Sequence, residues 1–289
     1  MDLVSPGPLA RRLRLITIHE GLTSALVWIP IFVLFTRARF DLSGALALAS
    51  IYYLAVVALE VPSGWMSDRL GRAPTLRVAA VSWVLAHSFF LVGDDRFWLI
   101  AVGQIFLAGG FASLSGTDVT YHYDTLEAFD RAAEYRSRQA RLRGLGLTVT
   151  AVSSLVGGVV GLVEVRLVFA IALVLAIGQF LVALRLEEPT TESTRAEGLT
   201  TQLGTCLRYL ADRYLGWVFF YGIVLVTLEH VAFTLMQPWL TEVLGRTADD
   251  VGATPIFAGA VFAVTSAIGA VAARASAPPW ASGSAPWPA

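Results

Sequence analysis

The sequence predicts an all-α polytopic membrane protein, and both its composition and the length of its apolar runs support this fold class. Hydrophobic residues make up 56% of the chain and charged residues 15%, whereas a soluble domain has about 25% charged residues. The apolar residues gather in runs of about 20, the length of helix that crosses a hydrocarbon core of about 30 Å. Helices also satisfy their own backbone hydrogen bonds in lipid. We expect eight spans, at residues 13–35, 42–65, 75–93, 97–118, 143–163, 167–186, 215–236 and 253–273.

The distribution of arginines predicts the orientation in the membrane. The chain has no lysine, so all 21 basic residues are arginine. If the N-terminus is cytoplasmic and the loops alternate, five arginines lie on the outer side and the other 16 on the cytoplasmic side. The outer five are Arg37, Arg39, Arg96, Arg166 and Arg246. Cytoplasmic loops carry an excess of basic residues, so we expect both termini in the cytoplasm.

The chain divides into two bundles of unequal size. Residues 1–187 hold six spans, and the helix formers and charges of residues 119–142 predict cytoplasmic extensions of the fourth and fifth helices. Residues 188–213 form a polar linker with a short amphipathic helix that we expect at the membrane surface. Residues 214–275 hold two spans of a second bundle. Residues 276–289, rich in Pro, Ala and Ser, are expected to be disordered.

A charged loop, GWMSDRLGRA at residues 64–73, follows the second span. Asp68 and Arg72 are four residues apart, so they can pair across one helical turn. Gly64 has no Cβ and is expected to let the backbone pass close to a neighbouring helix. Arg69 and Arg72 lie at headgroup level, where they favour anionic lipid. These charges therefore act either as a conformational latch or only as determinants of topology.

The loop resembles the signature of the major facilitator superfamily, G-x-x-x-D-R-x-G-R, which lies between the second and third helices of that family. Its fixed positions are matched by Gly64, Asp68, Arg69, Gly71 and Arg72. The preceding Glu60 and Pro62 resemble the E-x-P-x-G of many bacterial members. The resemblance covers about residues 10–275. It implies a bacterial-type inner-membrane protein with a complete first bundle of six helices and a C-terminally truncated second bundle.

The resemblance also implies that the Asp68–Arg72 pair meets an acid at the foot of the fourth helix and steadies one conformation. Asp118 and Asp124 are the candidates, and we prefer Asp118 because it is nearer the membrane. In the family the same loop also contacts a helix late in the second half. We expect that part of the latch to be missing, because this chain ends before such a helix.

Polar side chains at membrane depth are candidates for a solute or proton pathway, because a charge at the bilayer centre costs about 2.5–3.5 kcal/mol on insertion scales. Two acid and histidine pairs stand out, and the resemblance implies that the first, fourth and seventh helices line the central cavity. The candidates are His19, Glu20, Gln104, Glu229, His230 and Gln237. Histidine beside a carboxylate is suited to proton exchange near neutral pH. For Gln104 and His87 we prefer a hydrogen bond across helices.

The fifth span carries Gly157 and Gly158 in the stretch SSLVGG, and these glycines predict close helix packing. Drug/proton antiporters of the resembled family have a Gly-Pro shortly before such a pair. Here Ser153 and Ser154 precede the glycines instead. Antiport is therefore one possibility among several.

We expect secondary active transport of a small solute, with export of organic compounds preferred over uptake and proton coupling as a hypothesis. No motif predicts an enzyme, a metal site or a cofactor, and the arginines of membrane-flanking loops give no basis for nucleic-acid binding. The expected partners are the solute, the lipid bilayer and protons. The alternatives are an uptake facilitator, a transport-incompetent truncated remnant, and self-association through an incomplete second half.

Overall fold

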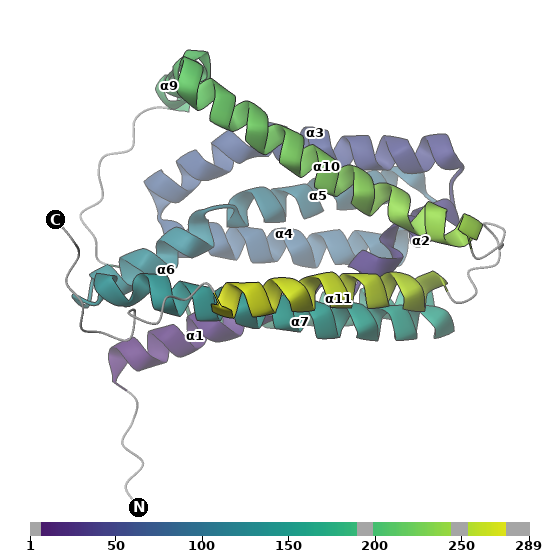
Figure 1. The fold of residues 1–289 in the computed structure, drawn as a ribbon, viewed down its shortest axis with the longest axis horizontal. Helices are drawn as coiled ribbons and strands as arrows, with labels where there is room; N and C mark the ends of the chain where they lie inside the picture. The colour runs from purple at the N-terminus through teal and green to yellow at the C-terminus, as the bar shows by residue number, and fades with distance from the viewer. Residues whose placement is uncertain (1–6, 190–198, 244–253, 276–289) are drawn as a thin grey trace, which may run out of the picture.

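The computed structural model describes residues 7–189, 199–243 and 254–275, and this part of the chain consists of helices and their connections, with no strand (Figure 1). The helices are α1 (Pro8–Thr23), η1 (Ile29–Ile31), α2 (Phe32–Arg37), α3 (Leu42–Leu70), α4 (Arg72–Gly93), α5 (Phe97–Leu114), α6 (Thr117–Glu127), η2 (Ala132–Glu134), α7 (Tyr135–Val163), α8 (Val165–Ala183), α9 (Leu199–Ala211), α10 (Arg213–Val243) and α11 (Thr254–Ala275). The predicted all-α fold class is confirmed.

Six helical segments of the described residues are long and apolar enough to cross a membrane. They are Leu42–Leu70, Arg72–Gly93, Phe97–Glu127, Ala132–Val163, Val165–Ala183 and Pro255–Arg274. The expected first and seventh spans are not among them. The first is broken into shorter helices. The seventh falls in α10, where the described apolar stretch is Arg213–Leu225 and most side chains from 226 to 241 lie outside the described residues. The sixteen residues of α1 and the two short helices after it replace the single helix expected over 13–35.

The break in the first span lies between Thr23 and Ile29, at the level of the bundle interior. Pro30 stands in the first turn of η1 and lacks the N–H that a continuous helix would need there. The broken backbone packs tightly against α7. A Cβ built on Gly157 would lie 1.8 Å from the carbonyl oxygen of Val27, and the Thr150 hydroxyl donates to the Ser24 carbonyl at 2.9 Å. The sequence pattern did not predict this break.

A second break separates α5 from α6 in the fourth span. Gly116 has a φ of +72°, a left-handed conformation that glycine adopts without strain. The neighbouring α3 braces the break, because the Ser115 hydroxyl donates to Glu60 at 2.7 Å and the Ser63 hydroxyl donates to the Ala112 carbonyl at 2.8 Å. Beyond it, α6 and the start of α7 supply the helices expected over residues 119–142, and their cytoplasmic placement stays a prediction.

Aromatic side chains fill the core of the first bundle near the break. Phe35 and Phe169 have ring centroids 4.4 Å apart, and Phe32 lies between Trp28 and Phe90 with centroids at 5.5 Å from each. By contrast, α3 is largely uncovered by protein. Apolar side chains at such a surface suit contact with lipid.

Helix α11 of the second half packs along α7 of the first bundle (Figure 1). The helices are antiparallel, since Gly158 of α7 faces Gly259 of α11 while Gly144 faces Arg274. A Cβ on Gly158 would lie 2.6 Å from the Pro255 carbonyl oxygen. The close packing predicted for the glycine pair is therefore confirmed. The Arg274 guanidinium also donates to the Thr148 hydroxyl at 3.0 Å.

The amphipathic helix predicted in the linker is present as α9, which contacts α3 and α10. Its placement at the membrane surface stays a prediction. Most of the polar linker before it, residues 190–198, and the tail over residues 276–289 lie outside the described residues.

Candidate functional site: the motif loop and the pocket beside it

The charged loop between α3 and α4 is held by the side chain of Arg72. Its guanidinium donates to Asp68 at 2.6 Å and to the Ser67 hydroxyl at 2.9 Å. The predicted pairing of Asp68 and Arg72 across one turn is therefore confirmed. Arg69 instead lies over the ring of Trp65, with 5.3 Å from the guanidinium carbon to the ring centroid. The two arginines of the motif thus have different contacts.

The acid that approaches Arg72 from the fourth span is Asp124, and this corrects the preference for Asp118. The Arg72 Nε lies 3.6 Å from the Asp124 Oδ2. Asp118 occupies the first turn of α6 and lines a pocket on another side of that helix. After the break at Gly116, the second turn of α6 brings Asp124 to Arg72, whereas the first turn meets the loop through the Thr117 hydroxyl, which donates to Ser67 at 3.1 Å.

A carboxylate that the sequence analysis missed completes the loop. Glu188 follows α8, and its two oxygens accept from the backbone N–H groups of Arg72 and Ala73, each at 2.7 Å. Carboxylates at a helix N-terminus satisfy unpaired N–H groups and the positive end of the helix dipole. The acidic pair directly after the sixth span was the available signal, although its partner could not be read from the sequence.

Neighbouring groups fix the segment that carries Glu188. Arg77 donates to the carbonyl oxygens of Ala183 at 3.2 Å and Leu186 at 2.7 Å, which satisfies the end of α8. Glu187 pairs with Arg12 at 2.8 Å, and its carbonyl accepts from the Tyr121 hydroxyl at 2.8 Å. The motif loop is therefore tied to α1, α6 and the end of α8.

The glycine of the motif that the structure requires is Gly71 and not Gly64. A Cβ on Gly64 would meet nothing within 4 Å, so its expected role in close packing is wrong. Gly71 has φ of +105° and ψ of 165°, a region that is nearly exclusive to glycine. A Cβ there would also lie 2.7 Å from the Glu188 carboxylate. Gly71 thus sets both the turn and the approach of Glu188.

We expect Gly71→Ala to lower the melting temperature in detergent by several degrees. The backbone strain alone costs roughly 1–3 kcal/mol, and each kcal/mol corresponds to about 2–4 °C in a chain of this size. Gly64→Ala is the matched control within the same motif. It should leave melting unchanged or raise it, because alanine is favoured inside a helix with open space around it. Equal melting of the two variants would contradict the assigned role of Gly71.

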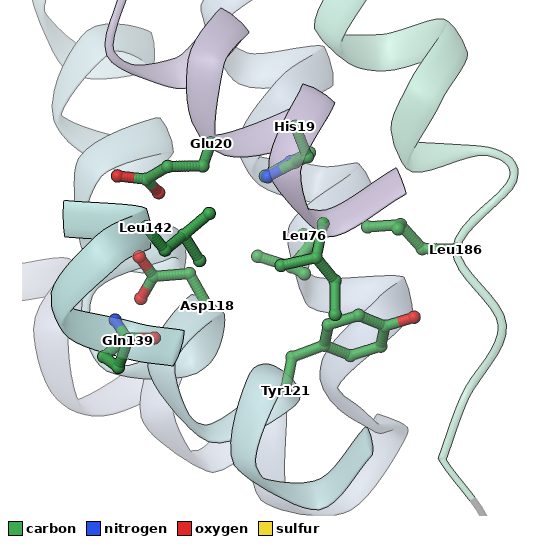
Figure 2. A pocket seen from close by; sticks show the side chains of 9 residues that line it. His19, Glu20, Leu76, Asp118, Tyr121, Gln139, Leu142 and Leu186 are labelled. Atoms are coloured by element: carbon green, nitrogen blue, oxygen red, sulfur yellow. The ribbon is translucent and has the colours of Figure 1, made fainter. Parts of the chain in front are cut away.

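A pocket lies beside this loop, between α1, α4, α6 and α7 (Figure 2). Figure 2 shows His19 and Glu20 entering it from α1, with Asp118 and Tyr121 opposite on α6. The carboxylates of Glu20 and Asp118 lie on the same side of the pocket. The complete lining is Ile16, His19, Glu20, Leu76, Asp118, Tyr121, Gln139, Leu142 and Leu186. The pocket therefore joins the predicted acid and histidine pair of the first span to an acid predicted for another role.

Glu20 is seated against a glycine. A Cβ on Gly146 of α7 would lie close to the Glu20 Oε1, so any larger residue there would require the carboxylate to shift. The Ser24 hydroxyl donates to the same oxygen at 3.4 Å. Asp118 and Arg143 are near enough to interact with Glu20 electrostatically, and Arg143 attracts both acids. The site thus combines two carboxylates with one guanidinium.

His19 is buried, and its Nε2 has no hydrogen-bond partner among the described residues. His122 also lies nearby on α6, where its Nδ1 is 2.6 Å from the Gln139 Oε1. Gln139 in turn lines the pocket. Sequence reasoning missed Gln139 and His122, which lie in the extensions of the fourth and fifth helices rather than in the apolar runs that were searched for polar residues.

A family model for the Major Facilitator Superfamily matches residues 18–285 of this chain. The chain belongs to the major facilitator superfamily. A search of curated proteins found no match. The match spans most of the sequence and includes the helices that form the loop and the pocket. This superfamily member is therefore an integral membrane protein and a transporter of small solutes.

Of the other predicted pathway residues of the superfamily member, Gln104 is the one whose side chain is described, and it does not line the pocket. Gln104 is buried in α5, and its Oε1 finds no partner among the described residues, so the expected hydrogen bond of this oxygen across helices is not formed there. The side chains of Glu229, His230 and Gln237 on α10 lie outside the described residues. Their part in a solute or proton pathway stays a prediction.

Proposed function

We propose that this transporter couples solute movement to protons, with Glu20 as the group that takes up and releases the proton. The observation that carries the proposal is the pocket that Glu20 and Asp118 line together with His19. Intramembrane ionisable residues of this kind mark proton relays and substrate paths in transporters. Export of organic compounds remains the direction that we propose.

The charges of the pocket support one exchangeable proton. The positive charge of Arg143 can balance one of the two carboxylates. The second carboxylate then adds a negative charge that repels the first. Uptake of a single proton would leave the group of Glu20, Asp118 and Arg143 neutral. Two nearby carboxylates that are shielded from water resist being ionised at the same time, so Glu20 and Asp118 are expected to share one proton.

Glu20 is the preferred carrier because it lies on the broken first span. Its helix, α1, ends three residues later at Thr23, and irregular backbone follows. Discontinuous helices mark binding sites in several transporter folds. The carboxylate of Glu20 also packs against Gly146 of α7. A change in the packing of α1 against α7 would therefore alter the surroundings of this carboxylate.

The test is transport in proteoliposomes with a panel of small organic solutes and an imposed pH gradient. We expect the gradient to accelerate transport of at least one solute, and Glu20→Gln to abolish that acceleration while leaving exchange without a gradient. Vesicles of the two orientations distinguish export from uptake. Glu60→Gln is the control, because Glu60 is a membrane-span acid outside the pocket. Undiminished gradient-driven transport by Glu20→Gln would show that the proton uses another group.

A further inference from the structure

One wall of the pocket that holds Glu20 is the segment that follows α8, residues 184–188, which we call the strap. Its Leu186 side chain lines the pocket and is 2% exposed. Figure 2 shows Leu186 on the side of the pocket opposite the carboxylates of Glu20 and Asp118. The next residue, Glu187, is exposed. The strap therefore lies between this side of the pocket and solvent.

Leu186 also belongs to a small apolar cluster at this end of the bundle. The buried members of the cluster are Ile16, Ala73, Leu76, Tyr121 and Leu186. All of them except Ala73 line the pocket as well. A gap between the strap and its neighbours would bring water to these side chains, and the loss of apolar burial favours the closed arrangement.

Hydrogen bonds fix the strap to α4 and α6. The Glu188 carboxylate accepts from the first backbone N–H groups of α4, each at 2.7 Å, and Arg77 donates to the Leu186 carbonyl at 2.7 Å. The Tyr121 hydroxyl donates to the Glu187 carbonyl at 2.8 Å. Hydrogen bonds to charged groups are stronger than those between neutral ones. The strap is therefore firmly seated on two of the helices that line the pocket.

The polar contact of the strap with α1 is weaker. It is the ion pair of Arg12 and Glu187, at 2.8 Å, in which the Glu187 side chain is 57% exposed. The Arg12 guanidinium also lies over the Phe129 ring, 5.5 Å from its centroid. An ion pair as exposed as this one contributes little to stability and is weakened further by salt. The seam between α1 and the strap is thus the side of the pocket that opens most readily.

We propose that the Arg12–Glu187 ion pair is a latch that holds α1 against the strap and thereby controls the access of solvent to the pocket of Glu20. When the pair opens, α1 can part from the strap, while Arg77 and Glu188 keep the strap on α4. The role of the latch in transport rests on the proposed function. If Glu20 carries the proton, the latch decides when that proton exchanges with this side of the membrane.

The test is the rate at which a cysteine in the pocket reacts with N-ethylmaleimide in lipid nanodiscs. The chain has one cysteine, Cys206, so Cys206→Ser gives a background without thiols. Ile16→Cys is the reporter, because Ile16 lines the pocket and is 7% exposed. We expect Arg12→Gln and Glu187→Gln each to speed the reaction roughly twofold to fivefold, as suits one partly exposed ion pair. Added salt should speed the reaction of the protein with the intact pair and leave Arg12→Gln unchanged.

The matched control is Arg14→Gln, which removes the same charge from α1. Arg14 is exposed and forms no ion pair in the described part of the chain, so the reaction should keep its rate. The double variant of Arg12 and Glu187 should react no faster than the faster single variant, because both changes remove one interaction. If Ile16→Cys does not fold, Leu142→Cys reports from the α7 side of the pocket.

An unchanged rate in Arg12→Gln and Glu187→Gln, or an equal acceleration in Arg14→Gln, would overturn the proposal. So would a double variant in which the two accelerations multiply. The measurement needs no transport, so it separates the latch from proton coupling. Faster labelling beside undiminished gradient-driven transport by Glu20→Gln would keep the latch and reject Glu20 as the proton carrier.

Discussion

Gly157→Ala is expected to destabilise this protein more than any other single methyl addition considered above. The new Cβ would lie 1.8 Å from the carbonyl oxygen of Val27, and a backbone atom cannot turn away as a side chain can. Overpacking costs typically about 1–3 kcal/mol and occasionally more. We therefore expect the melting temperature in detergent to fall by roughly 5–10 °C.

Gly21→Ala is the control for this experiment. Gly21 lies inside α1, close to the same break, and a Cβ there would meet nothing within 4 Å. It should melt at or above the wild-type temperature. Wild-type melting of Gly157→Ala would show that α7 does not press on the turn after Thr23, and the described packing of the first span would then be wrong.

The parts of the fold that could be predicted are those fixed by local patterns. Long apolar runs located all six described segments that suit the membrane, five in the first bundle and one in the second, because length and hydropathy alone decide whether a helix suits the membrane. The Asp68–Arg72 pair followed from its spacing of four residues. The glycines at 157 and 158 were correctly assigned to close packing, which needs only the absence of a side chain.

The parts that could not be predicted depend on where the chain turns. Gly116 redirects α6, so Asp124 reaches Arg72 although Asp118 is nearer the apolar run. Glu188 meets the start of α4 across more than a hundred residues of sequence, and no local pattern specifies that contact. The expected eight unbroken spans likewise overlooked the turn before Pro30, because apolar residues continue through it.

The motif loop also has a more complete set of contacts than its sequence suggested. We expected part of a latch to be missing with the distal helix of the second half. Within the first bundle, however, Arg72 already meets acids from α3 and α6, and Glu188 binds the backbone of the same turn. The loop can therefore couple the ends of α4, α6 and α8 to one another without a further helix.

Arg72→Gln is expected to lower the rate of solute transport by about tenfold, which corresponds to roughly 1.4 kcal/mol. The guanidinium lies between Asp68 and Asp124, and the Asp124 side chain is only 17% exposed. Without the arginine these two acids repel one another in a partly desolvated place. The change should disfavour the conformation in which α6 approaches the loop. Initial rates in proteoliposomes measure it, and Arg69→Gln is the control because Arg69 contacts Trp65 instead.

Double-mutant cycles then decide which acid is coupled to Arg72. Residues in contact show interaction energies of about 0.5–3 kcal/mol, whereas distant sites add within about 0.5 kcal/mol. We expect Arg72→Gln and Asp124→Asn to be strongly non-additive in unfolding free energy. Arg72→Gln and Asp118→Asn should be additive, since Asp118 faces the pocket of Glu20. Unfolding is the suitable readout because Asp118→Asn would also disturb transport through that pocket. If Arg72 instead proves to be coupled to Asp118 and additive with Asp124, then the partner of Arg72 is Asp118 in the first turn of α6, and the assignment made here is wrong.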